Sequence, residues 1–444
     1  MMQDDLTHDN FDFRGFSKEN RHETELIRDE EERSSKKPAK AGKAGKNKAG
    51  KNAKNAKDAG RERKAEKAGK AEKKSAASAK PQGKRPLLFT PMQLRGLTVR
   101  NRVWLPPMDM YSAYARDGKP TPFHYQHYVS RALGGFGLII AEATAVCPEG
   151  RISPKDVGLW EDSQIEAWRW IVQGVRDAGA AMAVQLNHAG RKGSTGCFGV
   201  GHDGASVPVE EGGWQTVAPS PNAYGSYAAP RELSVDEIHA IVGQFAAAAG
   251  RAVAAGFQAV EIHAAHGYLI SQFLDPLINE RTDEYGGDLN GRMRFLVEIV
   301  DAVRATIPQD MPLLVRISAT DWAAGGWDLG QTIAASRVLK DRGVDLVDVS
   351  TGGIVPDVTI PVKPNYQVPF AAQVRAQAGV PTTAVGLITK PKQAEKILRA
   401  EQADAIEIGR AALRDPAWPM RAAHKLGLAP ADLPYPDQYV RGAY

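Results

Sequence analysis

The sequence predicts an α/β protein, a closed (β/α)8 barrel that follows a disordered, basic N-terminal extension. Three observations support this prediction. Apolar segments rich in Val and Ile recur eight times after residue 86, amphipathic helical stretches separate most of them, and the first 85 residues are polar and strongly charged. We therefore assign residues 1–85 to the extension and residues 86–444 to the barrel.

The extension carries two blocks of opposite charge. Residues 1–35 hold 11 acidic residues and 5 Lys or Arg, whereas residues 36–85 hold 19 Lys or Arg and 4 acidic residues in a Lys/Ala/Gly-rich segment of low complexity. Such a segment buries too little apolar surface to offset its conformational entropy, so we expect disorder. A solvated tail is one interpretation. The other is a nonspecific contact of residues 36–85 with a polyanion such as RNA, DNA or an anionic membrane surface.

The eight expected strands are short and spread over the whole barrel segment. They are 102–107, 137–143, 181–187, 257–263, 312–318, 344–350, 381–386 and 404–409. We expect helices between most of them, for example at 235–255 and 290–306. An open, doubly wound sheet is the alternative, but it normally has a G-x-G-x-x-G turn after an early strand, and this sequence has none. The alternation therefore favours the closed TIM barrel.

Composition limits the classes of protein that need to be considered. The two cysteines, Cys147 and Cys197, form neither a C-x-x-C pair nor a metal-ligand spacing. No run of about 18 uncharged apolar residues predicts a membrane span. The N-terminus lacks the basic and apolar regions of a secretory signal. We expect a cytoplasmic protein with no metal site and no membrane span.

Polar residues and glycines follow the expected strands at their C-terminal ends, where a barrel places its active site. They are Met108, Asp109, Glu142, Ala143, Gln185, His263, His266, Arg316, Ser350, Gly352, Gly353, Gly386, Gly409 and Arg410. Glycines after the seventh and eighth strands let backbone N–H groups approach an anion, which predicts a phosphate site. Simple tight turns are the alternative explanation of these glycines.

The stretch E-I-H-A-A-H-G-Y-L places His263, His266 and Tyr268 just after the fourth expected strand. The two imidazoles could be a hydrogen-bonded structural pair, or a metal pair, although no third ligand is evident. The third interpretation is a pair of donors for a carbonyl oxygen or oxyanion. The phenol would then serve as a proton donor.

These residues belong to a longer pattern. I-H-A-A-H-G-Y-L-I-S-Q-F-L precedes N-E-R-T-D-E-Y-G-G-D-L-N-G-R-M-R-F, and Q-L-N-H-A-G-R-K and A-I-E-I-G-R-A-A-L-R-D-P occur at 185–192 and 405–416. With these motifs, the chain from about residue 87 resembles the old yellow enzyme family of FMN-dependent ene-reductases, and most of all its bacterial, thermophilic-like subgroup. The resemblance implies FMN as cofactor and NAD(P)H as reductant. It also implies an enone-type substrate, that is, the activated C=C bond of an α,β-unsaturated carbonyl compound.

The resemblance also implies roles for single residues. Gln185 would bind the flavin pyrimidine ring, and Arg316 would stabilise the negative charge of the reduced flavin. His263 and His266 would hold the substrate carbonyl oxygen while Tyr268 protonates the α-carbon. The further positions implied in cofactor binding are Pro107, Met108, Asp109, Ala143, His263, Gly352, Gly353, Gly386, Gly409 and Arg410. The further substrate contacts implied are Tyr111 and Arg441, the latter reaching into a neighbouring subunit's site and so implying a homo-oligomer.

The sequence departs from the family pattern in two places. Asp109 stands where the subgroup usually has cysteine, in P-M-D-M-Y-S. A carboxylate there should lower the flavin reduction potential unless it is protonated; it could also transfer protons or recognise a cationic substrate group. Residues 193–230 are rich in Gly, Ser, Pro and aromatic residues, and we interpret them as a substrate lid, with a variable surface loop as the alternative.

Two rival functions remain open. One is a relative of the same fold that acts on a larger, dienoyl-CoA-like substrate, although such enzymes carry a cysteine cluster that this chain lacks. The other is a flavoprotein that the basic tail tethers to nucleic acid. The presence of His263, His266 and Tyr268 favours catalysis over this second alternative.

Overall fold

A computed structural model describes residues 85–432 and 435–444, and all structural statements below refer to them. The predicted disordered extension lies outside the described residues except for Arg85. Its disorder and its contact with polyanions therefore stay predictions.

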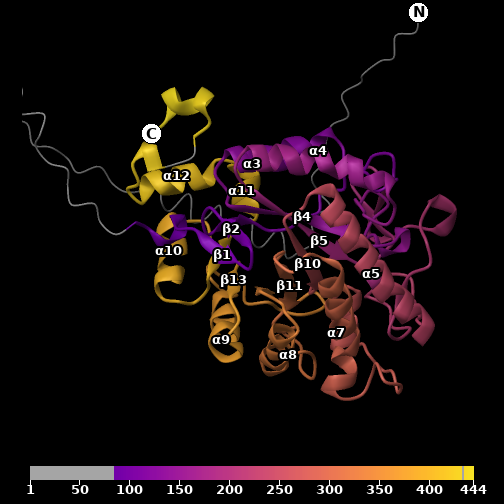
Figure 1. Ribbon diagram of the computed structural model, residues 1–444. Coiled ribbons are helices and arrows are strands. Elements are labelled where there is room, and N and C mark those ends of the chain that lie inside the picture. The colour runs from indigo at the N-terminus through magenta and orange to yellow at the C-terminus, as the bar shows by residue number, and fades with distance from the viewer. Residues whose placement is uncertain (1–84, 433–434) are drawn as a thin grey trace, which may run out of the picture. The chain divides into compact units, whose positions relative to one another are not determined.

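Eight parallel strands close into a barrel in the described part of the chain (Figure 1), which confirms the predicted fold. Each strand begins and ends within two residues of its expected limits. In barrel order they are β3 (Val103–Leu105), β4 (Leu138–Ala145), β5 (Ala181–Asn187), β10 (Ala259–Ala264), β11 (Leu313–Ser318), β12 (Leu346–Ser350), β13 (Thr382–Ala384) and β14 (Ala405–Glu407).

Helices surround the barrel (Figure 1). They are α3 (Pro122–Leu133), α4 (Ser163–Asp177), α5 (Val235–Ala255), α7 (Leu289–Thr306), α8 (Leu329–Asp341), α9 (Val368–Ala378), α10 (Pro391–Arg399) and α12 (Trp418–Lys425), with the short α6 (Leu269–Leu274) and α11 (Arg410–Arg414). Local sequence sets their ends. α5 begins at a capping box in which the Ser234 hydroxyl accepts from Glu237 N–H, and it ends at Gly256 with φ +92°.

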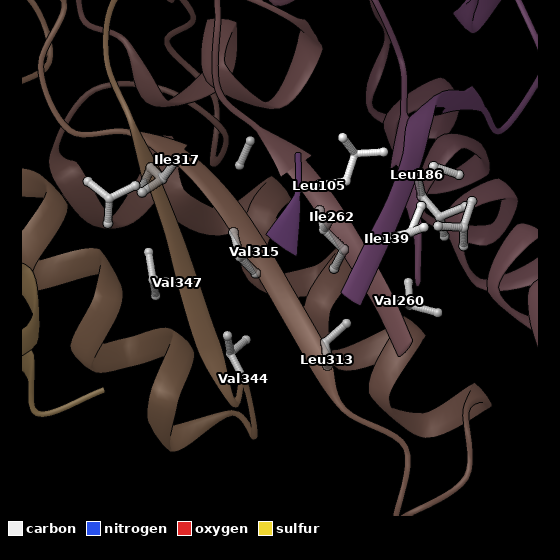
Figure 2. Close-up of a cluster of buried hydrophobic side chains, with 14 of the residues drawn as sticks. Leu105, Ile139, Leu186, Val260, Ile262, Leu313, Val315, Ile317, Val344 and Val347 are labelled. Carbon is white, nitrogen blue, oxygen red and sulfur yellow. The ribbon is translucent and has the colours of Figure 1, made fainter. Parts of the chain in front are cut away.

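Side chains alternate between the barrel interior and the surrounding helices because successive residues of a strand point to opposite faces. Figure 2 shows the helix-facing set on two neighbouring strands, with Val260 and Ile262 on β10 beside Leu313 and Val315 on β11. All four are fully buried. The intervening residues of each strand therefore line the interior, and there the polar residues of the site are found.

A hairpin closes the N-terminal end of the barrel. Strands β1 (Met92–Leu94) and β2 (Leu97–Val99) pair antiparallel, and their apolar residues pack with Trp104, Ile140 and Leu314 in one buried cluster. The turn is fixed by Arg95, whose Nε donates to Asp345 Oδ1 at 2.8 Å. This end is packed with apolar side chains, so polar chemistry is left to the opposite end.

Helix α5 is the one described helix long and apolar enough, by length and composition, to cross a membrane. In the barrel it packs against α7, and Ile238, Phe245 and Ala249 on one face are fully buried. That is the arrangement of a core helix, for which the same length and composition are common.

Residues 193–230 are more ordered than the expected loop. They contain an antiparallel pair, β6 (Thr195–Cys197) and β7 (Gly201–Ser206), and the strand β8 (Val217–Ala218), which pairs with β9 (Arg231–Glu232). Trp214 anchors the segment, because its indole N–H donates to Glu149 O at 2.9 Å and its ring stacks on the Arg151 guanidinium.

Candidate active site

The two histidines meet at the mouth of the barrel, as the strand-end pattern predicted. His263 lies at the end of β10, and His266 follows in a turn with φ +59°. His263 Nε2 and His266 Nδ1 lie 3.4 Å apart. Burial lowers the pKa of each imidazole well below its usual value, and the nearby Arg316 and Lys192 lower it further. Both rings are therefore neutral near pH 7.

Backbone contacts hold these rings in place. His263 Nδ1 accepts from Ala265 N–H at 3.2 Å, so the ring proton sits on Nε2 and faces His266. The backbone N–H of His266 donates to Ser318 Oγ at 2.9 Å. The ring Nε2 of His266 lies 2.7 Å from Ser350 Oγ. The position of the proton on His266 therefore depends on which way the Ser350 hydroxyl points.

Tyr268 lies beside the pair, with its ring centroid 4.9 Å from that of His263 in an edge-on arrangement. Burial raises the pKa of the phenol well above its usual value, and the charge of Asp109 adds to the shift. The hydroxyl therefore keeps its proton at neutral pH. Lys192 braces the turn, because its Nζ donates to His266 O at 2.9 Å and lies 5.2 Å from the centre of the Tyr268 ring.

Arg316 points into the same end of the barrel from β11 and faces three buried carboxyl groups. Its Nε lies 2.9 Å from Asp348 Oδ2, and its Nη2 lies 3.6 Å from Glu407 Oε2. Burial, followed by the charge of Asp348, raises the pKa of Glu261 to about 8 and that of Glu407 well above its usual value. These two carboxyl groups are therefore neutral at pH 7, and Asp348 is the ion-pair partner of Arg316.

Gln185 joins this cluster, because its Nε2 donates to Glu261 Oε1 at 2.8 Å. Although Arg316 is only 6% exposed, none of its N–H groups makes a directional hydrogen bond to another described residue. A buried guanidinium normally binds acceptors. A bound group with acceptors at this end of the barrel would supply them, as the pyrimidine ring of FMN would.

Asp109 follows β3 on the other side of the mouth. Its Oδ1 accepts from Ala143 N–H at 3.2 Å. Burial and the charge of Asp156 raise the pKa of Asp109 to about 7. Glu142 lies on the same side, where its carboxyl accepts from Tyr128 OH at 2.9 Å and from Met110 N–H at 3.0 Å. This side of the mouth holds three carboxyl groups.

Tyr111 ends the same segment with φ +50°, a strained conformation for a residue with a side chain. Burial and the charge of Asp109 raise the pKa of its phenol well above the usual value. The ring of Phe198, from the tip of the β6–β7 pair, lies edge-on at 6.4 Å between centroids. The segment 193–230 thus reaches the residues at the mouth, where the lid interpretation places it.

Different structural features account for the individual glycines that were expected at a phosphate site. A side chain on Gly353 would lie 2.7 Å from His266 Cα, so close packing against the histidine turn excludes one. The N–H of Gly352 donates to Thr320 O at 2.8 Å and is therefore already bonded. Gly386 has φ +112°, and a side chain on Gly409 would lie 3.8 Å from Met108 Sδ. These last two strand ends lie next to each other, as β13 and β14 pair.

Four further expected residues lie at or near the ends of elements. Pro107 and Met108 follow β3 and are half-buried, whereas Arg410 begins α11 and is exposed. Arg441 lies in the exposed C-terminal segment Asp437–Gly442 and takes part in none of the ion pairs found among the described residues. No group of three or more His, Cys, Asp or Glu suited to a metal ion occurs in the part of the chain that the structure describes.

Sequence reasoning missed the carboxyl groups inside the barrel. Glu261, Asp348 and Glu407 lie within short apolar strands, at interior-facing positions. The signal was present: an acidic residue in the middle of an apolar strand, such as V-E-I-H or L-V-D-V-S, is costly unless it is paired. Only the barrel, however, brings these three strands around Arg316.

Comparison with known proteins identifies the chain's relatives. The family model described as the NADH:flavin oxidoreductase / NADH oxidase family matches residues 87–429. The NADPH dehydrogenase of Bacillus subtilis is 45% identical over 356 residues, which cover 80% of this chain and 98% of that one.

Solved structures agree. The old yellow enzyme homologue from Zymomonas mobilis has a TM-score of 0.64 and 31% identity, with 79% of this chain and 99% of that chain covered. A 2-naphthoyl-CoA reductase complex has a TM-score of 0.71 and 25% identity, and this chain spans 52% of its length. The chain therefore belongs to the NADH:flavin oxidoreductase / NADH oxidase family, as an old yellow enzyme-type oxidoreductase that uses FMN and NAD(P)H.

Proposed function

We propose that this enzyme reduces the activated C=C bond of α,β-unsaturated carbonyl compounds. The observation that carries the proposal is the convergence of His263 Nε2 and His266 Nδ1, 3.4 Å apart, beside the protonated phenol of Tyr268. Two neutral imidazole nitrogens this close together suit donation to one carbonyl oxygen whose negative charge grows as the bond is reduced. A phenol at their side suits delivery of the proton.

In this mechanism FMN, when bound, would supply the hydride that it takes from NADPH. Arg316 and Gln185 would hold the flavin pyrimidine ring through N–H groups, and the Gln185 amide also donates to Glu261. Pro107, Met108 and Ala143 would form the wall beside the ring. Groups at the ends of β12, β13 and β14 would hold the phosphate, and they are Gly353, Gly386, Gly409 and Arg410.

Ser350 positions the histidine pair for this task. For both rings to donate to one carbonyl oxygen, the proton of His266 must sit on Nδ1, and its Nε2 must accept from Ser350 Oγ at 2.7 Å. Gln367 Oε1, 3.3 Å from Ser350 Oγ, competes for the same hydroxyl proton, but it already accepts from Thr351 Oγ1 at 2.7 Å. The shorter contact favours the donation to His266.

The test compares two oxidants of the NADPH-reduced enzyme. With Tyr268→Phe, we expect reoxidation by 2-cyclohexenone to slow about 10²–10⁴-fold. Reoxidation by molecular oxygen, which needs no proton on carbon, should change far less. Stopped-flow absorbance of the flavin measures both rates. Equal slowing with both oxidants, or a reduced wild-type enzyme that ignores enones, would refute the proposal.

We also propose that Arg441 completes the site of a neighbouring subunit in a homo-oligomer. Its exposed position beside Tyr439, Val440 and Tyr444, which are 58%, 61% and 55% exposed, supports an interface at this segment. A mixing experiment tests the idea. Arg441→Ala and Tyr268→Phe subunits, each weakly active alone, should regain activity when dissociated and reassembled together, because one site of a mixed pair then carries neither change. A monomer in sedimentation, or no recovery, would contradict it.

A further inference from the structure

Asp109 is the feature of this mouth that the proposed function leaves unused. Its backbone follows β3, and its carboxyl Oδ1 accepts one hydrogen bond, from Ala143 N–H at 3.2 Å. Of the described residues, none donates a hydrogen bond to Oδ2, and Asp109 is half-buried. A carboxyl group with one weak partner, at the edge of a polar mouth, is free to change its protonation state.

The groups around Asp109 explain why it holds a proton more tightly than an ordinary carboxyl group. Glu142 faces it from β4, and Asp156 from the loop that follows Pro148–Gly150. Phenols face it from its own segment, from α3 and from the turn after β10, and they are Tyr111, Tyr128 and Tyr268.

Among the described residues, Arg316 on β11 is the cation whose charge lowers the pKa of Asp109. Its guanidinium, however, is engaged by Asp348 at 2.9 Å. Burial and Asp156 together outweigh it and raise the pKa of Asp109 to about 7. A small additional negative charge in the mouth would therefore change the charge of this carboxyl group near neutral pH.

We propose that Asp109 takes up one proton from solvent when the bound flavin is reduced, and releases it when the flavin is reoxidised. The inference rests on FMN binding and not on the identity of the final substrate. Reduction places negative charge in the mouth beside Arg316, and a carboxylate near that charge is destabilised relative to its neutral form. Asp109, which stands where the subgroup usually has cysteine, thus holds a proton for as long as the flavin is reduced.

The proton count follows directly. NADPH gives a hydride, which is two electrons and one proton, and leaves as NADP⁺. The Asp109 carboxylate gains one proton from water and becomes a neutral acid, so the reductive half-reaction consumes one proton from solution. When an acceptor takes the hydride and a proton, Asp109 returns its proton, and the oxidative half-reaction then consumes none from solution.

Proton uptake can be counted without measuring turnover. The oxidised holoenzyme is mixed anaerobically with one equivalent of NADPH at pH 8 in weak buffer that contains a pH-indicator dye. We expect the wild type to consume up to one proton per flavin reduced, and Asp109→Asn and Asp109→Cys to consume close to none. Flavin absorbance reports the cofactor content of each variant. If one of the two variants folds poorly and loses its flavin, the other still gives the proton count.

The flavin midpoint potential gives a second measurement. Each proton taken up with two electrons adds about 30 mV per pH unit to the slope. Between pH 7 and 8.5 the wild-type slope should therefore exceed that of Asp109→Asn by up to this amount. Glu261→Gln is the matched control when the count is repeated at pH 7. Glu261 is a buried carboxyl group on the Arg316 side whose pKa is raised to about 8, so at pH 7 it already holds its proton before the flavin is reduced. The proton uptake of this variant at pH 7 should equal that of the wild type.

Equal proton uptake in the wild type and Asp109→Asn would overturn the proposal. Loss of uptake in Glu261→Gln alone would overturn it too, by assigning the proton to the Arg316 side. A protein that retains no flavin refutes the inference together with the FMN assignment. Failure of enones to reoxidise the enzyme refutes only the proposed function, because the count is made before any enone is added.

Discussion

Two groups of three carboxyl groups flank the mouth of this barrel, and their charges are balanced in different ways. In the first group, Glu261 on β10, Asp348 on β12 and Glu407 on β14 surround one guanidinium, and Arg316 pairs with one of them. In the second group, Asp109, Glu142 and Asp156 accept hydrogen bonds, and no Lys or Arg of the described residues forms an ion pair with them. The first group therefore has an ion pair and protonated carboxyl groups, whereas the second has hydrogen bonds and raised pKa values without an ion pair.

The two sides of the mouth therefore differ in how their charge responds to pH. A fixed guanidinium keeps its charge over the whole physiological pH range, so the Arg316 side presents a constant field. The Asp109 side has an acid whose pKa lies near 7, so its charge follows pH and the charge of its neighbours. The four predictions below change one member at a time, in order of decreasing expected effect.

Arg316→Met should have the largest effect. It leaves three buried carboxyl groups without their cation, and removing one partner of a buried pair costs about 3–5 kcal/mol. We expect the free energy of unfolding to fall by this amount in urea titrations, and the purified protein to have lost most of its flavin. Arg316→Lys is the control that keeps the charge, and its free energy of unfolding should lie between those of the wild type and Arg316→Met. An unchanged urea midpoint in Arg316→Met would contradict the role given to the ion pair.

Asp348→Asn should have a smaller effect on stability. It removes the negative charge 2.9 Å from Arg316 Nε, but Glu407 remains 3.6 Å from the guanidinium and the amide oxygen can still accept from the Thr383 hydroxyl. Because Glu407 can ionise in its place, we expect a loss of about 1–3 kcal/mol. Thermal unfolding of the apoprotein measures it. A loss as large as that of Arg316→Met would show that Glu407 does not substitute.

Asp109→Asn should change the pH dependence of stability. The folded pKa of about 7 lies above the unfolded value of about 3.9. Between these pH values the folded state holds more protons than the unfolded state, so the contribution of Asp109 to stability falls as pH rises. We therefore expect the apoprotein melting temperature of the variant, relative to wild type, to increase from pH 4 to pH 8. A difference that is constant with pH would argue that Asp109 is ionised throughout.

Glu261→Gln should have the smallest effect. The pKa of Glu261 is raised to about 8, so at pH 7 a neutral amide replaces a neutral acid of similar size. Its Oε1 still accepts from Gln185 Nε2. We expect a change in unfolding free energy within about 1 kcal/mol at pH 7. A larger loss would mean that Glu261 is ionised and shares Arg316 with Asp348.

Much of the fold was accessible from the sequence, because the relevant signals are local. Eight Val- and Ile-rich segments marked the strands within two residues, and the helix expected at 235–255 is α5. The hairpin that closes the N-terminal end, and the β6–β7 pair in residues 193–230, were not predicted. Both are short strands whose pairing depends on contacts with the finished barrel, as the bond between Arg95 and Asp345 illustrates.

The site divides in the same way. The sequence by itself determined the barrel, the strand-end positions of His263, His266, Gln185 and Arg316, and the family to which their spacing belongs. Only the tertiary structure decided which groups meet: Ser350 with the second histidine, three carboxyls with one guanidinium, and Asp109 with Glu142 and Asp156. The physical reason is that strand periodicity fixes which way a side chain points, whereas charge and pKa depend on neighbours from other strands, which only barrel closure brings within a few ångströms.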